Sequence, residues 1–208
     1  MLIPQEIVIQ RLRESSIKVN GVLHLGAHNC EELGFYRRMG LDPTAVVWVD
    51  AIDEKVQENR ARGIPNVYQG VITNKDDDTV TFHISNNVES SSVLEFGTHA
   101  TQHPYVHWVD HRVLTTTTLD TFFARHRLQA QAYDFWNLDI QGAEMLALYG
   151  GTHALMHAKA IYLEVNSEEV YRGCAQIPQI TAFLGSYGFK CVEIKMTEHG
   201  WGDALFVR

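Results

Sequence analysis

Cysteine, proline and long apolar runs are all scarce in this sequence. The three cysteines, Cys30, Cys174 and Cys191, lie far apart without C-x-x-C spacing, which argues against a disulfide framework and against a zinc knuckle. No segment approaches the roughly 20 apolar residues of a membrane-spanning helix, and the acidic, amphipathic start of the chain does not resemble a signal peptide. The sequence therefore predicts a soluble protein of a reducing compartment, most simply the cytoplasm.

Positive charge is also scarce, because 17 Lys and Arg stand against 25 Asp and Glu and the net charge is −8. No run of basic residues could follow a phosphate backbone, so a nucleic-acid substrate is disfavoured. The 208 residues, 45% of them hydrophobic, suffice for one well-buried domain. We expect a single domain, with an N-terminal helix or lid over residues 1–18 and an α/β core over residues 19–208.

The chain is organised around residues 20–32, which read NGVLHLGAHNCEE. An apolar run over 22–25 breaks at Gly26 and leads into helical apolar spacing over 31–39, which predicts a strand, a tight turn and a helix. Gly26 would admit a ligand close to the backbone, and the free N–H groups at the helix start favour a carboxylate or phosphate. A plain strand-to-helix turn is the alternative.

An acidic residue, Asp50, follows the second predicted strand, residues 45–49. Nucleotide-binding α/β folds place the group that accepts hydrogen bonds from ribose hydroxyls at this position. The alternative role is to cap the next helix, residues 54–62, but Asp53 is better placed for that. We therefore expect Asp50 to be free for a cofactor.

Two more acids follow later strands. Asp139 comes near the end of the strand predicted over 133–140, and Glu164 near the end of the strand over 160–165. The carboxyl ends of parallel strands meet at one edge of a sheet, where open α/β folds bind ligands. Asp139 and the Gly26 turn should therefore be neighbours.

The remaining strands complete an α/β pattern. Residues 67–72 read as a third buried strand, and residues 79–84 alternate like a strand with one solvated face. A helix over 176–187 precedes two closely linked strands over 189–195 and 203–208. The pattern predicts a mostly parallel sheet with an antiparallel hairpin at its edge.

Three features have more than one interpretation. The serine-rich loop over 85–96 either lines a ligand site or is a flexible surface loop. Glu144, in the first turn of a predicted helix, either favours the helix dipole or takes part in chemistry. Four histidines, each four residues apart, would suit a metal site on one helix face, but Pro104 and the β-rich segment after it argue against that helix. These histidines are His99, His103, His107 and His111.

Several motifs occur in one order along the chain. They are the HLGAHNCEE turn, the TNKDDDTVTFHISN hairpin with ESSSVLEF after it, TTTTLDTFF followed by NLDIQGAEMLALYG, and the LEVNSEEVYRGC, GFKCVEIK and GWGDALFV segments. Together they resemble the FkbM family of S-adenosylmethionine-dependent methyltransferases. The resemblance implies a class I methyltransferase fold, a Rossmann-like three-layer sandwich with a seven-stranded, mostly parallel sheet, an antiparallel last strand and an inserted β-hairpin.

The resemblance implies that S-adenosylmethionine is the cofactor and S-adenosylhomocysteine the product. Gly26 and Ala27 match the turn near the methionine part of the cofactor, Asp50 matches the ribose-binding acid, and Ser91 and Ser92 match a serine-rich loop near the site. The residues expected to bind the cofactor are His24, Gly26, Ala27, His28, Glu32, Asp50, Ala51, Val71, Ser91, Ser92 and Asp139.

The sequence departs from the family pattern in three places. His24 stands where the family usually has an aspartate, Cys30 where a glycine is common, and Ala51 where a proline is common. An imidazole cannot supply a carboxylate's charge to the ammonium group of the cofactor. Asp139 or Glu31 would have to supply it instead.

The family's D-x-x-G-x-E motif corresponds to Asp139, Gly142 and Glu144. A sulfonium methyl group is already electrophilic, so the enzyme mainly has to align the acceptor and exclude water. An alcohol acceptor also needs a general base. The catalytic candidates are Asp139, His28 and Glu164, with Glu144 as a supporting partner; we hypothesise that Asp139 is the base or orients it, and we expect no catalytic metal.

FkbM-like enzymes methylate hydroxyls of sugars, glycolipids and polyketides, so the resemblance implies a small-molecule or glycan acceptor, with a sugar hydroxyl as the first expectation. Tyr105, Trp108 and Trp201 could stack on sugar faces, although burial in the core is an alternative for at least two of them. Three other functions stay open: methylation of a polyketide, lipid or other hydroxyl, a cofactor-binding partner module without catalysis, and a metal-dependent hydrolase that uses the histidines. A homodimer is compatible with each.

Overall fold

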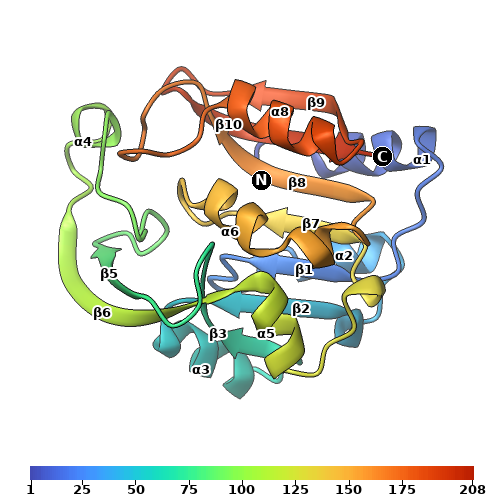
Figure 1. The fold of residues 1–208 in the computed structure, drawn as a ribbon, viewed down its shortest axis with the longest axis horizontal. Helices are drawn as coiled ribbons and strands as arrows, with labels where there is room; N and C mark the ends of the chain where they lie inside the picture. Colours follow the sequence, from blue (N-terminus) through green and yellow to red (C-terminus); the bar gives the residue numbers. More distant parts are fainter.

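A seven-stranded sheet forms the centre of the computed structural model, which describes residues 1–208 (Figure 1). Its strands are β1 (Val22–Leu25), β2 (Val46–Asp50), β3 (Val67–Gln69), β7 (Phe135–Leu138), β8 (Ala160–Asn166), β9 (Lys190–Met196) and β10 (Trp201–Val207). They lie in the order β3-β2-β1-β7-β8-β10-β9.

All neighbouring strands from β3 to β8 pair in parallel, whereas β10 is antiparallel to both β8 and β9. The expected α/β fold, with a mostly parallel seven-stranded sheet and an antiparallel last strand, is therefore confirmed. The C-terminal strands do form a hairpin, but only β9 lies at the edge. β10 inserts between β8 and β9, which brings its residues next to those of β8.

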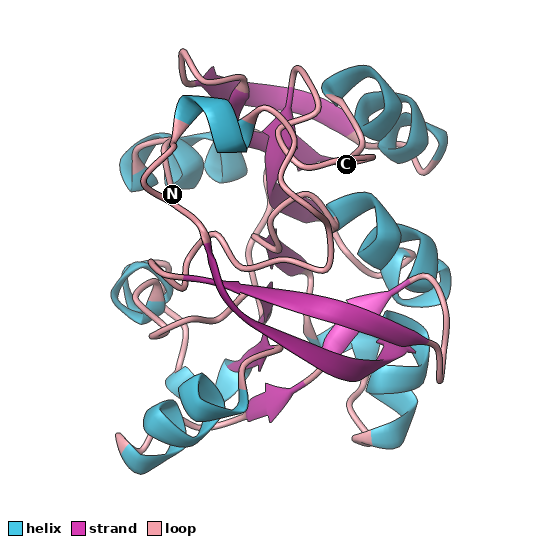
Figure 2. Ribbon diagram, turned by 90° about the vertical axis from the view of Figure 1, so that its left-hand side faces the viewer, coloured by secondary structure: helices cyan, strands magenta, loops and turns pink.

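Helices cover both faces of this sheet, as Figure 2 shows with the sheet seen along its edge. The helices are α1 (Gln5–Glu14), α2 (Leu33–Arg38), α3 (Asp53–Ala61), α4 (His99–Gln102), α5 (Leu119–Arg125), α6 (Glu144–Gly150), α7 (Thr152–Leu155) and α8 (Ile177–Ser186), with the 3₁₀ turns η1 (Pro43–Ala45) and η2 (Ala130–Ala132). The first three pack on one face, and α5 to α8 pack on the other. Strands covered on both faces explain the continuous apolar runs of the sequence.

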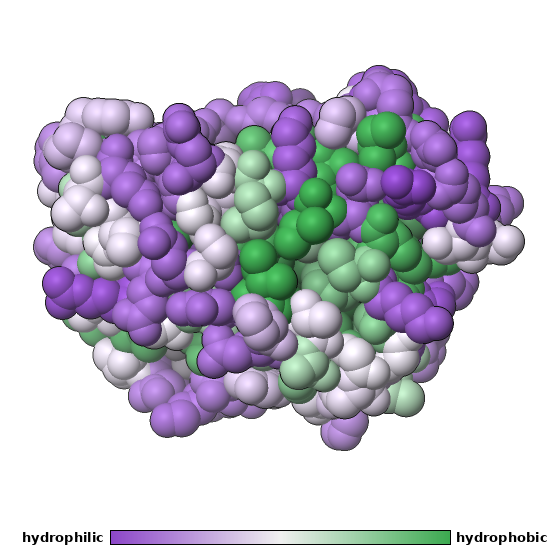
Figure 3. Space-filling view, turned by 90° about the horizontal axis from the view of Figure 1, so that it is seen from above, coloured by the Kyte–Doolittle hydropathy of each residue, from purple (hydrophilic) through white to green (hydrophobic).

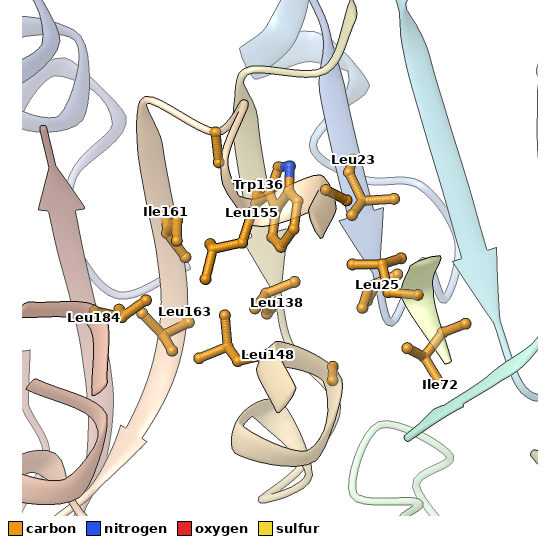
Figure 4. Close-up of a cluster of buried hydrophobic side chains, with 14 of the residues drawn as sticks. Leu23, Leu25, Ile72, Trp136, Leu138, Leu148, Leu155, Ile161, Leu163 and Leu184 are labelled. Carbon is orange, nitrogen blue, oxygen red and sulfur yellow. The ribbon is translucent and has the colours of Figure 1, made fainter. Parts of the chain in front are cut away.

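Buried side chains fill the space between the sheet and each helical layer. On the α5 to α8 side, Leu25, Leu138 and Leu163 of three adjacent strands contact a layer that includes Leu148 and Leu184 (Figure 4). Burying one such side chain contributes about 2 kcal/mol. This packing fixes which strand face each residue occupies, and with it the register that aligns the carboxyl ends of the strands.

The N-terminal helix α1 belongs to the opposite layer, where Val8 and Leu12 are buried. Arg11 Nε of this helix lies 2.9 Å from Glu193 Oε2 of the edge strand β9.

Viewed from the β9 side, the surface carries a band of apolar side chains among polar ones (Figure 3), and Ile194 of β9 is 42% exposed. None of the helices is both long and apolar enough to cross a membrane. A lid role for residues 1–18 and a single-domain organisation stay predictions.

A second sheet contains β4 (Val71–Thr73), β5 (Thr79–Ser85) and β6 (Trp108–Thr118), in the order β4-β6-β5. β5 and β6 form the expected antiparallel hairpin. The predicted third strand over 67–72 is wrong as one element, because the chain leaves the main sheet at Gly70 and β4 pairs with β6. Figure 1 shows β5, β6 and α4 beyond the carboxyl ends of the main-sheet strands.

The four spaced histidines do not share a helix. His99 begins the single turn of α4, His103 follows that turn, His107 precedes β6 and His111 lies on it. No group of three or more His, Cys, Asp or Glu side chains is arranged to hold a metal ion. The positions of these four histidines therefore give no support to a metal site.

Candidate functional site

The register of the main sheet aligns acidic residues at its carboxyl edge. Leu25 pairs with Val49 on one side and with Leu138 on the other, so Gly26 lies between the chain positions that follow, Asp50 and Asp139. The next strands continue this row, because Leu138 pairs with Leu163 and Glu164 pairs with Asp203 of β10. The expectation that Asp139 neighbours the Gly26 turn is confirmed, since the Asp139 N–H donates to Leu25 O at 3.0 Å.

A cavity of about 540 Å³ opens along this edge and extends under the second sheet. Most of the predicted site residues line it, namely His24, Gly26, His28, Glu32, Asp50, Ala51, Val71, Ser91, Asp139 and Glu164. Three predicted residues do not: Ala27 and Glu144 are buried in the protein around the turns, and Ser92 donates its hydroxyl to Gln141 O at 2.7 Å. The sequence therefore predicted most of one wall of the cavity.

Gly26 adopts a left-handed conformation with φ of +84°. A Cβ atom at this position would lie 1.8 Å from the Asp139 carbonyl oxygen. The N–H groups of Gly26 and Ala27 both donate to Val49 O, at 2.9 and 3.0 Å. Gly26 is thus required first for the close approach of two strand ends, and the backbone that approaches it is that of Asp139.

Asp50 is only 8% exposed and accepts two backbone hydrogen bonds, from Ile52 N at 2.8 Å and from His28 N at 2.7 Å. The prediction that Asp53 caps α3 and leaves Asp50 free is wrong, since Ile52 holds the cap position and Asp50 supports the turn before the helix. Burial raises the pKa of Asp50, and the two N–H donors lower it. A carboxylate has about four lone-pair sites, so two remain for a ligand.

His24 is 2% exposed and lies with its Nδ1 2.9 Å from the Tyr36 hydroxyl. Burial lowers the pKa of His24 to about 4, so the imidazole is neutral at physiological pH. His28, in contrast, lies in the turn with its Nδ1 2.9 Å from Glu31 Oε1. The structure therefore leaves the negative charge at this end of the cavity to the acids, as the departure from the family pattern implied.

Asp139 and Glu164 are joined by one side chain, that of Gln141. Its Nε2 donates to Asp139 Oδ1 at 2.7 Å and to Glu164 Oε2 at 2.8 Å, and its Oε1 accepts from the Tyr171 hydroxyl at 2.6 Å. Burial raises the pKa of Asp139 and raises that of Glu164 well above its usual range, with nearby carboxyl groups adding to both effects. Gln141 and Tyr171 also line the cavity.

Asp203 completes the row and was not predicted as a site residue. Its Oδ2 accepts hydrogen bonds from the Tyr162 hydroxyl and from the Leu2 backbone N–H. Asp203 lies directly opposite Glu164 across the β8–β10 pair and lines the cavity. Asp203 lies there only because of the antiparallel register of β10, and no local motif in the sequence predicts that register.

Glu144 is 1% exposed and points into the turn that follows β7. Its Oε1 accepts the N–H groups of Ile140 at 2.9 Å and of Gly142 at 3.2 Å. Glu144 is expected to be a supporting partner of the catalytic candidates, but its side chain hydrogen-bonds none of them. Glu144 instead holds the backbone on both sides of Gln141.

Burial also raises the pKa of Glu144 to about 8, which leads to a prediction for stability. The folded protein keeps this proton at pH values where the unfolded chain, with a carboxyl pKa near 4.5, has lost it. We therefore expect the free energy of unfolding to fall as the pH rises from about 5 to about 8. In Glu144→Gln this fall should become shallower, because the amide mimics the protonated acid and its oxygen still accepts both N–H groups. Denaturant unfolding over a pH series measures both slopes, and equal slopes would contradict the prediction.

The serine-rich loop packs against the site. Ser90, Ser91 and Ser92 are buried, and Ser91 Oγ donates to Val88 O at 2.6 Å. The alternative of an exposed surface loop is therefore wrong for these three serines. Ser91 lines the cavity, whereas Ser92 anchors the backbone of Gln141.

The far end of the cavity is bordered by aromatic and imidazole rings. Tyr105, 70% exposed, and the half-buried Trp201 line it together with His99 and His103. Trp108 does not line the cavity but stacks on a core ring. None of the lining residues is lysine or arginine, whereas seven are aspartate or glutamate. The lining therefore favours neutral or cationic ligands over anionic ones.

A family model described as the methyltransferase FkbM domain matches residues 24–191. No curated protein matches the chain. Among solved structures, the chain is similar to magnesium protoporphyrin IX methyltransferase from Synechocystis PCC 6803 with bound SAM, at 13% identity and a TM-score of 0.48 over 98% of this chain and 77% of that one. It is also similar to a SAM-dependent methyltransferase from Bacteroides fragilis in complex with S-adenosylhomocysteine, at 9% identity and a TM-score of 0.47 over 99% and 78%.

Proposed function

The chain belongs to the FkbM methyltransferase family, and on that premise we propose that it methylates a hydroxyl group of a sugar or glycan. Membership makes the chain an S-adenosylmethionine-dependent methyltransferase. The nature of the acceptor is our proposal. The observation that carries it is the acid-rich cavity, which runs from the ribose-type acid Asp50 to the Asp139 and Glu164 carboxyl groups.

One end of the cavity fits S-adenosylmethionine by its hydrogen-bond acceptors and its apolar residues. Asp50 has unused lone pairs for the two ribose hydroxyls, and the neighbouring apolar residues Ile52, Val71 and Phe82 suit a flat adenine ring. Asp139 is the carboxylate next to the Gly26 turn, where the ammonium group of the methionine part is expected. These residues would hold the cofactor between β1, β2 and β7.

When bound, the cofactor supplies an electrophilic methyl group. The chain then has to place an acceptor oxygen in line with it and to remove the hydroxyl proton. Asp139, when ionised, accepts that proton from the acceptor hydroxyl. Glu164 and Asp203 lie beside it and accept hydrogen bonds from the other hydroxyls of a polyol, which orients the reacting one.

The acceptor class follows from the charges and rings of the lining. Phosphate or carboxylate groups would lie near seven acidic side chains without a lysine or arginine, so nucleic acids and sugar phosphates are disfavoured. A sugar offers several hydroxyl donors to these acids and an apolar face to Trp201 and Tyr105. An apolar acceptor would leave the remaining lone pairs of these carboxyl groups without donors, at a desolvation cost.

The first test is calorimetric titration with S-adenosylmethionine and S-adenosylhomocysteine. We expect micromolar binding by the wild-type protein and at least about 100-fold weaker binding by Asp50→Ala, because two hydrogen bonds to a charged group are lost. Asp53→Ala is the matched control: it removes the same charge three residues later, from a side chain that does not line the cavity. No binding by the wild-type protein would refute the cofactor assignment.

The second test is a screen of acceptors with the loaded enzyme. Neutral glycosides are compared with their phosphate esters by following transfer of a labelled methyl group. We expect methylated product from neutral glycosides and at least about tenfold lower kcat/KM for the phosphorylated counterparts. Preferential methylation of a phosphate ester or of RNA would contradict the proposed acceptor class.

A further inference from the structure

Gln141 has every polar atom of its side chain engaged between elements that are far apart in sequence. Its two N–H bonds go to Asp139 after β7 and to Glu164 on β8, and its carbonyl oxygen accepts from Tyr171. Its backbone carbonyl accepts from the Ser92 hydroxyl of the serine-rich loop at 2.7 Å. With three partners for its side chain and a fourth for its backbone carbonyl, this residue has very little freedom.

The backbone at this position is also constrained. Gln141 lies in the left-handed region with φ of +55°, which a residue with a side chain adopts at a cost. Glu144 accepts the N–H groups of the residues on either side, Ile140 and Gly142. The turn is therefore held from both flanks in the one conformation that directs the amide of Gln141 at both carboxyl groups.

The two carboxyl groups face further charged and titratable groups. Asp203 faces them from β10, Glu144 from the start of α6, the neutral His24 from β1, and Tyr171 from the segment after β8. The N-terminal amino group of Met1 is the one cationic group that acts on Asp139. Two adjacent carboxylates in such surroundings cannot both stay ionised at neutral pH without a compensating donor. Gln141 is the only side chain that donates to both.

We propose that Gln141 is a positioning residue that holds the Asp139 and Glu164 carboxyl groups as a pair sharing one proton. One carboxylate of the pair thereby stays ionised to accept the proton of the acceptor hydroxyl. An amide suits this role because its NH₂ group donates twice and carries no charge, whereas a glutamate in its place would donate to neither and add a further acid. The inference rests on the proposed function, because it concerns the proton acceptor of that reaction.

The test compares the wild-type protein with Gln141→Met, which has a similar length and no donor. Both proteins are loaded with S-adenosylhomocysteine, and the Asp and Glu carboxyl carbons are followed by ¹³C NMR over a pH series. We expect the ionisation of the pair to move upward by about one to two pH units in Gln141→Met, because two hydrogen bonds to a carboxylate are lost. With an acceptor from the screen, kcat at pH 7 should fall about tenfold and recover at higher pH.

Arg127→Met is the matched control for backbone strain. Arg127 has a similar φ of +56° and does not line the cavity, so this variant should leave the titration of the pair in place. A Gln141→Met protein that binds S-adenosylhomocysteine and titrates like the wild type would overturn the inference while leaving the proposed function intact. If the wild-type protein does not bind S-adenosylhomocysteine, the result counts against the proposed function itself.

If Gln141→Met does not fold, the wild-type protein decides the question. The side-chain amide signals of Gln141 should shift with the same midpoint as the carboxyl pair, since the amide bonds both of its members. If the amide chemical shifts stay constant through that midpoint, the Gln141 amide does not respond to the ionisation of the pair, and the inference fails.

Discussion

Replacing Gly26 with alanine is expected to destabilise the fold by more than about 3 kcal/mol and to abolish cofactor binding. The added Cβ would lie 1.8 Å from the Asp139 carbonyl oxygen and 2.8 Å from its carbonyl carbon. Asp139 cannot simply withdraw, because its N–H is bonded to Leu25 O between the two central strands. Relief of the overlap would separate β1 from β7 at the edge where the cofactor is expected. Denaturant unfolding and calorimetry with S-adenosylhomocysteine measure the two losses.

Gly40→Ala separates this overlap from the cost of a left-handed backbone. Gly40 has φ of +88°, close to that of Gly26, but nothing lies within 4 Å of the Cβ it would gain. We expect a loss of only about 1–2 kcal/mol, with normal cofactor binding. If the two variants were equally destabilised, contact with Asp139 would not be the reason for glycine at position 26.

The main sheet could be predicted because its signals are local. The strands β1, β2 and β7 are fully buried apolar runs, and each is followed by a turn and a helical pattern, so Gly26, Asp50 and Asp139 could be assigned to one edge before any register was known. The departure at Gly70 could not be predicted. Residues 67–72 form one apolar run, and the partner that removes β4 from the main sheet is β6, which lies some forty residues further along the chain.

The roles of individual acids depended on contacts that spacing does not reveal. Asp53 has the position of a helix cap by sequence, yet Asp50 reaches the N–H of Ile52 instead. Glu144 belongs to the family motif, but its carboxyl group bonds backbone N–H groups and stays out of the cavity. Gln141 was the unassigned middle residue of the same motif. Its amide reaches both carboxyl groups only because β7 pairs with β8 in register, which brings Asp139 and Glu164 together.

Asp139→Asn is expected to lower kcat by about 100- to 1000-fold with saturating cofactor and a methylated acceptor from the screen. The amide has the same shape, and its oxygen can still accept from Gln141, so the fold should be preserved. What the variant lacks is a carboxylate able to accept the proton of the acceptor hydroxyl. The variant also lacks the charge that faces the ammonium group of the cofactor, and saturating cofactor offsets the weaker binding that this causes. Single-turnover measurement of methyl transfer at saturating cofactor tests this step directly, because saturation separates the loss of the proton acceptor from a loss of cofactor affinity.

Glu164→Gln should behave differently, although its carboxyl group lies next to that of Asp139. Burial and three neighbouring acids, Asp139, Glu144 and Asp203, raise the pKa of Glu164 well above its usual range. We therefore predict that Glu164 is the member of the pair that holds the proton. A glutamine mimics that protonated form, and we expect it to lose less than about tenfold in kcat. The opposite ranking, with Glu164→Gln the more damaged variant, would place the ionised carboxylate on β8. The two substitutions are nearly equal in size and shape, so a large difference between them reports which carboxyl group accepts the proton.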